Sequence, residues 1–536
     1  MGAGALKRRS MLGWAMAAGL AGCERPTAQP PLPPCRWVGP DPARGHRLRS
    51  ADALPAPALT RRARVLVLGA GIAGLAALRR LHHDGVTDSW ALELHDLSGG
   101  NSQGHTLAGM ACPLGAHYLP VPGPQAEAVQ ALLLDLGLLR RTVRGLEPDE
   151  RHLCHAPQER LFIDGAWQDG LLPSADDRPA TLAQYRRFAQ RVQDASATLG
   201  FSMPTLHSPW TPGHATLDAQ PFATWLAREQ LTDERLLGYL DYCCRDDYGA
   251  GLAQVSAWAG LHYFASRHGF HAPGDAEAER EPVFTWPQGN AFLAQAMAEP
   301  LRAHVLTGRT ALRVQEERHG VDILVWDEGA QRAERWQAER VIVALPLFVA
   351  ARLLADWADP LRAALDLTAR RQPHAPWLVA NLHLREPLLD RLGAPPAWDS
   401  VHFTPAGTST ALGYVDAMHQ NWRPHPGPTV LTMYHALPVS QRAALLSDSA
   451  AAWGAKVLAE LALLHPDAPF KIEAIDLARW GHAMSIPAPG VRGADGLRAL
   501  RSARGRIRFA HSDLAGYSVF EEALTLGHEA AHVAQV

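Results

Sequence analysis

The sequence contains little lysine, no paired-cysteine motif and no long apolar run. Lys7, Lys456 and Lys471 are its only lysines, and the formal net charge of the 536 residues is -3. No basic block follows the first ten residues, which argues against a nucleic-acid partner. The six cysteines include no C-x-x-C pair, which argues against a zinc ribbon and a disulfide framework. A chain of this length with 47% hydrophobic and 20% charged residues is typical of a large globular protein with two lobes.

The first 22 residues have the composition of an export signal. Arg8 and Arg9 precede an apolar run at residues 11–22, and that run of 12 is too short to span a bilayer. The arginine pair resembles a twin-arginine signal, and residues 20–23 resemble a bacterial lipoprotein box in which Cys23 is acylated. We therefore expect a periplasmic protein, or one that contacts a membrane only through a lipid on Cys23. The alternative is a cleaved signal with an incidental thiol at Cys23.

Residues 23–61 are rich in proline and show little apolar periodicity. Nine prolines lie within residues 24–60, which predicts a semi-extended linker. The alternative is an ordered arm that lies on the body of the protein with Trp37 as its anchor.

A phosphate-binding motif follows this segment. Residues 65–68 form a short apolar run that is typical of a strand buried on both faces of a parallel sheet. The sequence GAGIAG at 69–74 comes next, and its glycines suit a tight turn, close approach of a pyrophosphate and packing of a helix on the strand. Residues 89–92 predict a second strand, and Glu93 then lies where a carboxylate can bind a ribose hydroxyl. Together these features predict a dinucleotide site.

Further segments resemble the flavin-containing amine oxidase superfamily, which includes monoamine and polyamine oxidases and, more distantly, phytoene desaturases and protoporphyrinogen oxidases. Gly99 and Gly100 match the first two residues of its GGR segment, with Asn101 in place of arginine. Residues 507–531 resemble its closing element, although His511 and Glu522 replace glycines. Shorter resemblances lie at 114–118, 285–290, 311–314, 341–346 and 479–490.

The resemblance implies FAD as the cofactor and an α/β fold. A discontinuous Rossmann-like FAD-binding domain would comprise residues 62–150, 285–346 and 475–536. An inserted α+β substrate domain would comprise residues 151–284 and 347–474. The implied cofactor-binding residues are Gly69, Gly71, Ile72, Ala73, Gly74, Glu93, Gly99, Gly100, Asn101, Ala311, Trp480, Asp513 and Phe520.

The implied chemistry is removal of a hydride from a C–H bond of a small organic substrate, an amine or polyamine among the candidates, by flavin N5. Tyr118 and His117 would lie beside the flavin ring. The resemblance also implies a lysine near N5, but residues 377–381 occupy the expected region and contain none. We therefore expect a dehydrogenase or desaturase that passes electrons to a quinone or a carrier protein.

Two segments rich in polar and aromatic residues, 241–249 and 256–263, leave two interpretations open. They could line the substrate cleft, or Arg245 and the two aspartates after it could form an ion-pair network that closes a helix end. His262 and Tyr263 could equally be satisfied groups at a domain interface. Of the adjacent cysteines, Cys243 and Cys244, at least one is expected in the core.

The segment His528–His532 fits the HExxH motif of zinc hydrolases. A third ligand commonly follows that motif, but only residues 533–536 remain, and the segment lies where the superfamily's last helix packs. We therefore expect no metal. The alternative functions are a non-catalytic FAD-binding lipoprotein and, last, a zinc hydrolase.

Overall fold

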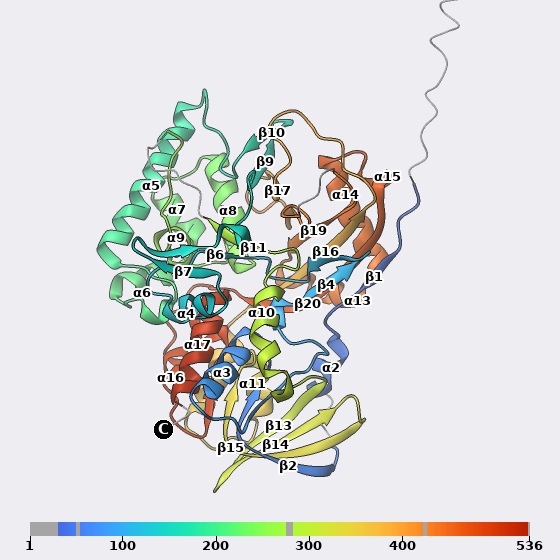
Figure 1. Cartoon of the computed structure of the whole chain (residues 1–536). Helices are drawn as coiled ribbons and strands as arrows, with labels where there is room; N and C mark the ends of the chain where they lie inside the picture. The colour runs from blue at the N-terminus through green and yellow to red at the C-terminus, as the bar shows by residue number, and fades with distance from the viewer. Residues whose placement is uncertain (1–29, 50–53, 275–281, 422–425, 534–536) are drawn as a thin grey trace, which may run out of the picture. The chain divides into compact units, whose positions relative to one another are not determined.

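Two sheets organise the residues that the computed structural model describes, which are 30–49, 54–274, 282–421 and 426–533. The chain from Pro33 onward forms one compact unit (Figure 1). The predicted export signal at 1–22 and Cys23 lie outside the described residues. Within the described residues, we find no helix with the length and apolar character needed to cross a membrane.

The first sheet contains the phosphate-binding motif. Its central strand, β2, is parallel to β3 on one side and to β15 on the other, as expected for the buried run at 65–68. The antiparallel strands β14 and β13 extend one edge, and β21 pairs with β15. In spatial order the strands are β12 (Val305–Leu306), β3 (Ser89–Leu92), β2 (Pro57–Leu68), β15 (Arg332–Val343), β14 (Gly320–Asp327) and β13 (Arg309–Glu317), with β21 (Ile507–Phe509) beside β15.

Helices α3 (Ile72–His83) and α17 (Phe520–Val533) lie side by side against this sheet (Figure 1). Their contact is unusually close, because a Cβ atom on Gly527 would lie 2.0 Å from the carbonyl oxygen of Ala73. Helices α4 (Glu127–Asp135) and α10 (Ala291–Ala298) pack against the same pair. Small residues at these crossings thus fix the start of α3 at the sheet edge.

The second sheet has eight strands and belongs to the inserted domain. Strand β20 is antiparallel to β16, which in turn pairs with β19. Apolar side chains from β16 and β20 pack against α14 (Ala450–Leu464). In spatial order the strands are β1 (Cys35–Trp37), β20 (Ile472–Ser485), β16 (His374–Leu384), β19 (Thr429–Ala436), β18 (Ala411–Asp416), β17 (Asp399–His402), β9 (Glu159–Ile163) and β10 (Ala166–Asp169).

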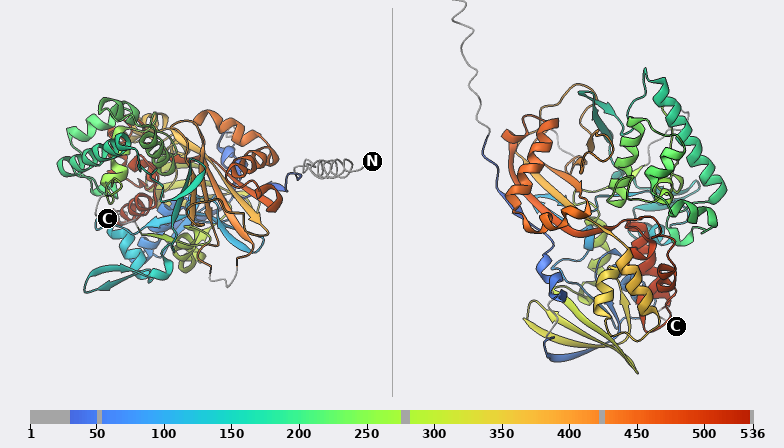
Figure 2. Two further views of the ribbon diagram at one scale, coloured as in Figure 1. Left: turned by 90° about the horizontal axis from the view of Figure 1, so that it is seen from above. Right: turned by 180° about the vertical axis from the view of Figure 1, so that it is seen from behind.

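A group of five helices also belongs to the inserted domain. Figure 2 shows these helices in green, whereas α14, described above, is orange. They are α5 (Pro179–Leu199), α6 (Pro212–Asp218), α7 (Phe222–Arg228), α8 (Glu234–Tyr248) and α9 (Ala257–Ala265). The other helices are α2 (Pro42–His46), α11 (Leu347–Leu353), α12 (Leu361–Arg371), α13 (Arg442–Ser447), α15 (Ala468–Lys471) and α16 (Asp495–Arg501). Three two-stranded sheets pair β4 (Gly104–Leu107) with β5 (Met110–Pro113), β6 (Tyr118–Pro120) with β11 (Val283–Thr285), and β7 (Leu139–Thr142) with β8 (Gly145–Pro148).

The structure corrects the predicted linker at 23–61 for the residues that it describes there, 30–49 and 54–61. Strand β1 pairs in parallel with β20, and the guanidinium of Arg479 lies 4.6 Å from the ring centroid of Trp37. Helix α2 follows, and β2 begins at Pro57. The alternative of an ordered arm anchored by Trp37 is therefore the one that the structure supports, because this proline-rich segment gains backbone pairing and aromatic packing from distant parts of the chain.

The structure also corrects one domain boundary. Residues 475–485 were predicted to belong to the dinucleotide domain. They lie instead in β20, a strand of the second sheet that pairs with β1 on one side and with β16 on the other. Ile475 and Leu477 are fully buried there. Burial against the inserted domain decides the place of this strand.

Substitution Gly527→Ala should destabilise the protein. A methyl group would overlap the backbone oxygen of Ala73, which cannot move without displacing α3, and overpacking of this kind costs about 1–3 kcal/mol. The cost exceeds the gain of about 1 kcal/mol that alanine offers in a helix interior. In urea unfolding, Gly527→Ala should have a lower midpoint than Gly505→Ala, where a Cβ atom meets nothing within 4 Å. Equal midpoints would contradict the close packing of α3 and α17.

Candidate functional site

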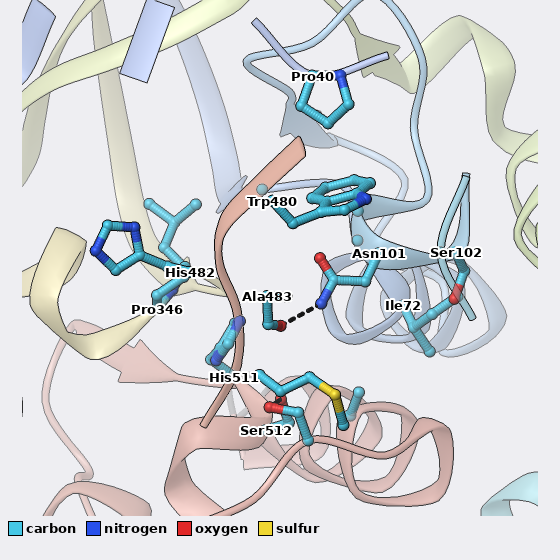
Figure 3. A pocket seen from close by; sticks show the side chains of 18 of the residues that line it. Pro40, Ile72, Asn101, Ser102, Pro346, Trp480, His482, Ala483, His511 and Ser512 are labelled. Carbon is cyan, nitrogen blue, oxygen red and sulfur yellow. Dashed lines mark hydrogen bonds between the residues drawn. The ribbon is translucent and has the colours of Figure 1, made fainter. Parts of the chain in front are cut away.

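A cavity of about 620 Å³ lies at the carboxyl ends of the parallel strands of the first sheet. Its wall includes the residues that directly follow β2, β3, β15 and β21. Ligands of doubly wound α/β folds bind at this edge. Figure 3 shows part of the cavity, with Ile72, Asn101, Trp480 and Ser512 around it.

The turn at 69–74 has the shape that a phosphate group requires. Gly69 adopts φ +93°, and a Cβ atom there would lie 2.6 Å from the carbonyl oxygen of Ala344. A Cβ atom on Gly74 would lie 1.9 Å from the carbonyl oxygen of Gly69, so only glycine lets the helix approach the strand. Helix α3 begins directly after Gly71, which has no side chain to cap the first turn. The amides of that turn and the positive end of the helix dipole can therefore bind an anion.

Glu93 lies at the end of β3 in the wall of the same cavity. Its side chain is buried, and its two carboxylate oxygens accept hydrogen bonds from the backbone amides of Ala70 (2.8 Å) and His95 (2.9 Å). These bonds fix the carboxylate beside the glycine turn. Each oxygen has a further lone pair that can accept a hydrogen bond from a ribose hydroxyl.

Gly99 and Gly100 place a second loop against the first. Both have left-handed backbone angles, with φ +117° and +57°, and Gly99 forms a parallel bridge with Gly71. The side-chain amide of Asn101 donates a hydrogen bond to the carbonyl oxygen of Ala483 on β20, as Figure 3 shows. Asn101 thus joins the dinucleotide domain to the second sheet, and it presents no charge to the cavity.

Asp513 holds three parts of the wall together. Its carboxylate accepts hydrogen bonds from the amide of Leu347 (2.8 Å) and pairs with the imidazoles of His374 (3.1 Å) and His511 (3.2 Å). Burial alone would raise the pKa of Asp513, but the two histidines hold it well below its usual range. The carboxylate is therefore ionised and already engaged, so it positions β16 and the segment after β21 around the cavity.

The cavity brings together nearly all of the predicted cofactor-binding residues. The exception is Gly74, which faces the strand and permits the close packing described above. The predicted catalytic pair, Tyr118 and His117, also lies in the wall. The wall contains Gly69, Gly71, Ile72, Ala73, Glu93, Gly99, Gly100, Asn101, Ala311, Trp480, Asp513 and Phe520.

A second, smaller chamber of about 110 Å³ adjoins the first. His117, Tyr118, Asp246 and Tyr434 line both cavities. The chamber is otherwise lined largely by groups on or next to β9, α8, α9, β17 and β18. They include Glu159, Tyr242, Tyr263, Trp398 and Asp399. Three carboxyl groups thus face a chamber whose described lining contains neither lysine nor arginine.

Burial and repulsion by neighbouring carboxylates disfavour ionisation of Asp246 and Asp399. Burial and the neighbouring Asp247 raise the pKa of Asp246 to about 7, although the hydroxyl of Tyr118 donates a hydrogen bond to it (3.3 Å). Burial, together with Glu159 and Asp246, raises the pKa of Asp399 well above its usual range. A cation in the chamber would reverse these shifts, because it favours the charged form of each carboxyl group.

His117 and Tyr434 form the partition between the two cavities. Their rings stack, with centroids 4.4 Å apart, and His117 also contacts the ring of Tyr118 at 5.0 Å. Burial lowers the pKa of His117 to about 3, so its imidazole is neutral at physiological pH. The partition is thus aromatic and uncharged.

The structure decides between the interpretations of segment 241–249. Asp246 lines both cavities, which supports the cleft-lining interpretation. The predicted network is wrong in its pairing, because Arg245 binds Asp241 (2.9 Å) whereas Asp247 binds Arg267 (2.9 Å). These separate pairs leave Asp246 without a basic partner of its own on α8.

The neighbouring residues behave as buried structural groups. A ring nitrogen of His262 lies 3.2 Å from the carbonyl oxygen of Ser202, and the side chain is fully buried. Cys243 and Cys244 both lie in the hydrophobic core. Tyr263 lies in the wall of the acidic chamber instead.

Four residues that line the chamber were not predicted as site residues. They are Asp399, Glu159, Trp398 and Tyr434. They come from three strands of the second sheet, with Glu159 on β9, Tyr434 on β19, and Trp398 and Asp399 at the start of β17, and no spacing links the three segments in the sequence. A carboxylate next to a tryptophan at 398–399 was the only available signal, and it carries no specific motif.

The HExxH segment lies on α17 and contacts a cation of the protein itself. Both imidazoles hydrogen-bond the guanidinium of Arg80, at 2.6 Å for His528 and 3.1 Å for His532. A bound arginine repels a metal ion and engages the nitrogens that would coordinate it. In the described part of the chain, we find no group of histidine, cysteine and acidic residues suited to a metal.

Comparison with known proteins agrees with this geometry. The family model for the NAD(P)-binding Rossmann-like domain matches residues 67–136. A protein of Mycobacterium tuberculosis with the provisional name flavin-containing monoamine oxidase is 27% identical over 314 residues. That match covers 58% of this chain and 62% of the relative, so it spans less than two thirds of the relative's length.

Solved structures share the fold. Putrescine oxidase bound to putrescine superposes with a TM-score of 0.64 at 20% identity, covering 88% of this chain and 99% of that chain. Cyclohexylamine oxidase from Brevibacterium oxydans gives 0.62 at 19% identity, covering 88% and 99%. A fatty acid isomerase from P. acnes gives 0.62 at 16% identity, covering 87% and 97%. The predicted α/β class, with a Rossmann-like domain and an inserted substrate domain, is confirmed.

The raised pKa of Asp246 predicts a pH-dependent effect of Asp246→Asn on stability. An acid whose pKa is raised on folding binds more protons in the folded state, so its contribution to stability falls as pH rises from about 4 to about 7. Asparagine removes this loss. The thermal midpoint of Asp246→Asn, relative to wild type, should therefore be higher at pH 8 than at pH 5 by roughly 2 °C or more. Asp176→Asn, at an exposed site, is the control. A difference that does not change with pH would refute the raised pKa.

Proposed function

We propose that this protein is an FAD-dependent oxidoreductase that oxidises an organic cation, an amine, at a carbon beside the nitrogen. The acidic chamber beside the dinucleotide cavity carries this proposal. Glu159, Asp246 and Asp399 converge there without a basic side chain in the described lining, and buried carboxyl groups of one sign favour a ligand of the opposite charge. The similarity to amine oxidases in sequence and fold agrees with it.

The large cavity fits FAD in its shape and its donor groups. The glycine turn leaves room for a pyrophosphate at the start of α3, and Glu93 is fixed where a ribose would lie. Ala311, Trp480 and Phe520 contribute apolar surface from three separate elements. When bound, the flavin supplies the hydride acceptor.

The chain's own residues would bind the substrate and manage its proton. The carboxyl groups attract the ammonium group, and the tyrosines around them exclude water and supply aromatic faces that favour a cation. An ammonium must lose a proton before a hydride can leave the neighbouring carbon. The pKa of Asp246 is about 7 without a cation, and a bound ammonium lowers it again, so Asp246 is then a carboxylate that can accept that proton, and it faces both cavities.

The first test combines a spectrum with substrate selectivity. Purified protein should show the absorbance bands of oxidised flavin, and released cofactor should be FAD. Asp399→Asn should lower kcat/KM for amines by about 10- to 100-fold, since removing a charge partner from a buried site costs about 1.5–3 kcal/mol. Oxidation of a neutral isostere such as the matching alcohol should change little, and Asp176→Asn should leave both unchanged. Equal losses for cation and isostere would contradict charge recognition.

We further propose an electron acceptor other than oxygen. Of the two lysines in the described chain, Lys456 lies over the ring of Trp453 and Lys471 pairs with Asp467, so neither reaches the cavity. Trp377 and Val379 lie in its wall, in the region where the resemblance implies a lysine.

Reoxidation of the reduced protein should therefore be faster with a soluble quinone than with air-saturated buffer. Stopped-flow absorbance measures both rates on one preparation. Val379→Lys should raise the oxygen rate more than the quinone rate. Rapid reoxidation by oxygen in the wild type would refute the proposal about the acceptor and leave the proposed substrate class untouched.

A further inference from the structure

The segment Pro33–Arg49, here called the N-terminal arm, is fastened to the second sheet at its beginning. Strand β1 adds to the edge of that sheet by parallel pairing with residues 475–477 of β20. Arg36 makes two hydrogen bonds to the carboxylate of Asp476, at 2.7 and 2.9 Å. The aspartate is 2% exposed and also binds His105, so this fastening reaches into the body of the protein.

The arm is fastened to the dinucleotide domain at its other end. Arg44 on α2 makes two hydrogen bonds to Asp96, at 2.7 and 2.9 Å, and one to the carbonyl oxygen of Leu94. Those residues directly follow Glu93. Arg47 binds Glu328 at 3.0 Å in the turn between β14 and β15. The arm therefore bridges the two domains.

Between its two fastenings the arm forms part of the wall of the large cavity. Pro40, Gly45, His46, Leu48 and Arg49 all line it. Figure 3 shows the ring of Pro40 on the side of the cavity that Trp480 occupies. A ligand in the cavity would thus lie against the arm as well as against the glycine turn.

The arm also brings an uncommitted positive charge to this wall. Within the described residues, Arg49 and Arg352 line the cavity and make no hydrogen bond or ion pair. Both are exposed. The other lining arginines are engaged, with Arg267 on Asp247, Arg309 on Asp327 and Arg479 on the carbonyl oxygen of Leu446.

Other groups near Arg49 do not neutralise it. Asp41 is the acidic residue of the arm, and its carboxylate caps α2 by accepting a hydrogen bond from the amide of Ala43 (2.9 Å). His46 and His482 lie close to Arg49, and burial and neighbouring cations lower the pKa of both. An anion is the ligand that this part of the wall favours.

We propose that the N-terminal arm is an integral part of the dinucleotide site, which encloses the bound cofactor and supplies Arg49 as a cationic contact to its phosphates. The inference rests on the proposed FAD cofactor and is independent of the substrate. Because the arm is fastened to both domains and forms part of the cavity wall, detachment of α2 from the loop after Glu93 would free one side of the bound cofactor. The arm therefore governs how long the protein retains its cofactor.

The test measures cofactor release from the purified holoprotein. Flavin fluorescence rises when the cofactor leaves, so its increase after dilution gives the release rate. Arg49→Ala should release flavin about tenfold faster than the wild type, the factor expected for loss of one hydrogen bond to a charged group. Arg44→Ala removes three hydrogen bonds that hold α2 to the loop after Glu93 and should also release flavin at least about tenfold faster. Arg49→Lys should release flavin at a rate between those of the wild type and Arg49→Ala. Arg302→Ala removes an exposed arginine paired with Glu299 and should release flavin at the wild-type rate.

Hydrogen exchange on the wild-type protein gives a second readout that needs no variant. Amides of residues 33–49 should exchange more slowly in the holoprotein than in protein stripped of its cofactor. Flavin-containing protein with unchanged release in Arg44→Ala and Arg49→Ala, or with equal exchange of the arm in both states, would overturn this inference alone. Protein that neither contains nor takes up flavin would overturn the proposed function as well.

Discussion

The close approach of α3 to the strand before it and to α17 beside it is the constraint on which the site depends. At Gly74 and at Gly527, a single methyl group would overlap a backbone oxygen, at 1.9 and 2.0 Å. Because neither backbone can yield, the start of the helix is fixed at the edge of the sheet. That position directs the first-turn amides of α3 into the cavity, and it places Glu93 and Gly100 beside them.

Charge divides the site into two regions. The large cavity has two arginines in its wall that no described residue engages, Arg49 and Arg352, while the adjoining chamber has three carboxyl groups. The neutral imidazole of His117 and the ring of Tyr434 lie between them. A dinucleotide phosphate would therefore favour the large cavity, and an ammonium group would favour the chamber. Burial of Asp246 and Asp399 strengthens the preference of the chamber for a cation, because a charge that is removed from water gains more from a partner of opposite sign.

Strand β20 of the inserted domain contributes to the wall of the large cavity and to its connections. Strand β20 carries Trp480 and His482 in the cavity wall, accepts the Asn101 hydrogen bond at Ala483 and pairs with the N-terminal arm at residues 475–477. Its membership in the second sheet, rather than in the dinucleotide domain, means that the cofactor cavity is built by both domains. Relative movement of the domains would alter the cavity and the arm together.

The sequence by itself determined the features that depend on neighbouring residues. The apolar run at 65–68, the glycine turn at 69–74 and the position of Glu93 predicted a strand, a turn and a helix that the structure contains, because backbone shape and burial pattern are encoded locally in such a unit. The resemblance at 99–101 and 507–520 also led to residues that line the cavity.

Only the tertiary structure decided the features that join distant segments. Composition alone described residues 23–61 as a linker, since the pairing of β1 with β20 depends on a strand more than 400 residues away. The acidic chamber draws Glu159, Asp246 and Asp399 from β9, α8 and β17, and Arg80 meets the HExxH histidines across two helices. Such contacts follow from packing and burial of the whole chain, and no spacing in the sequence specifies them.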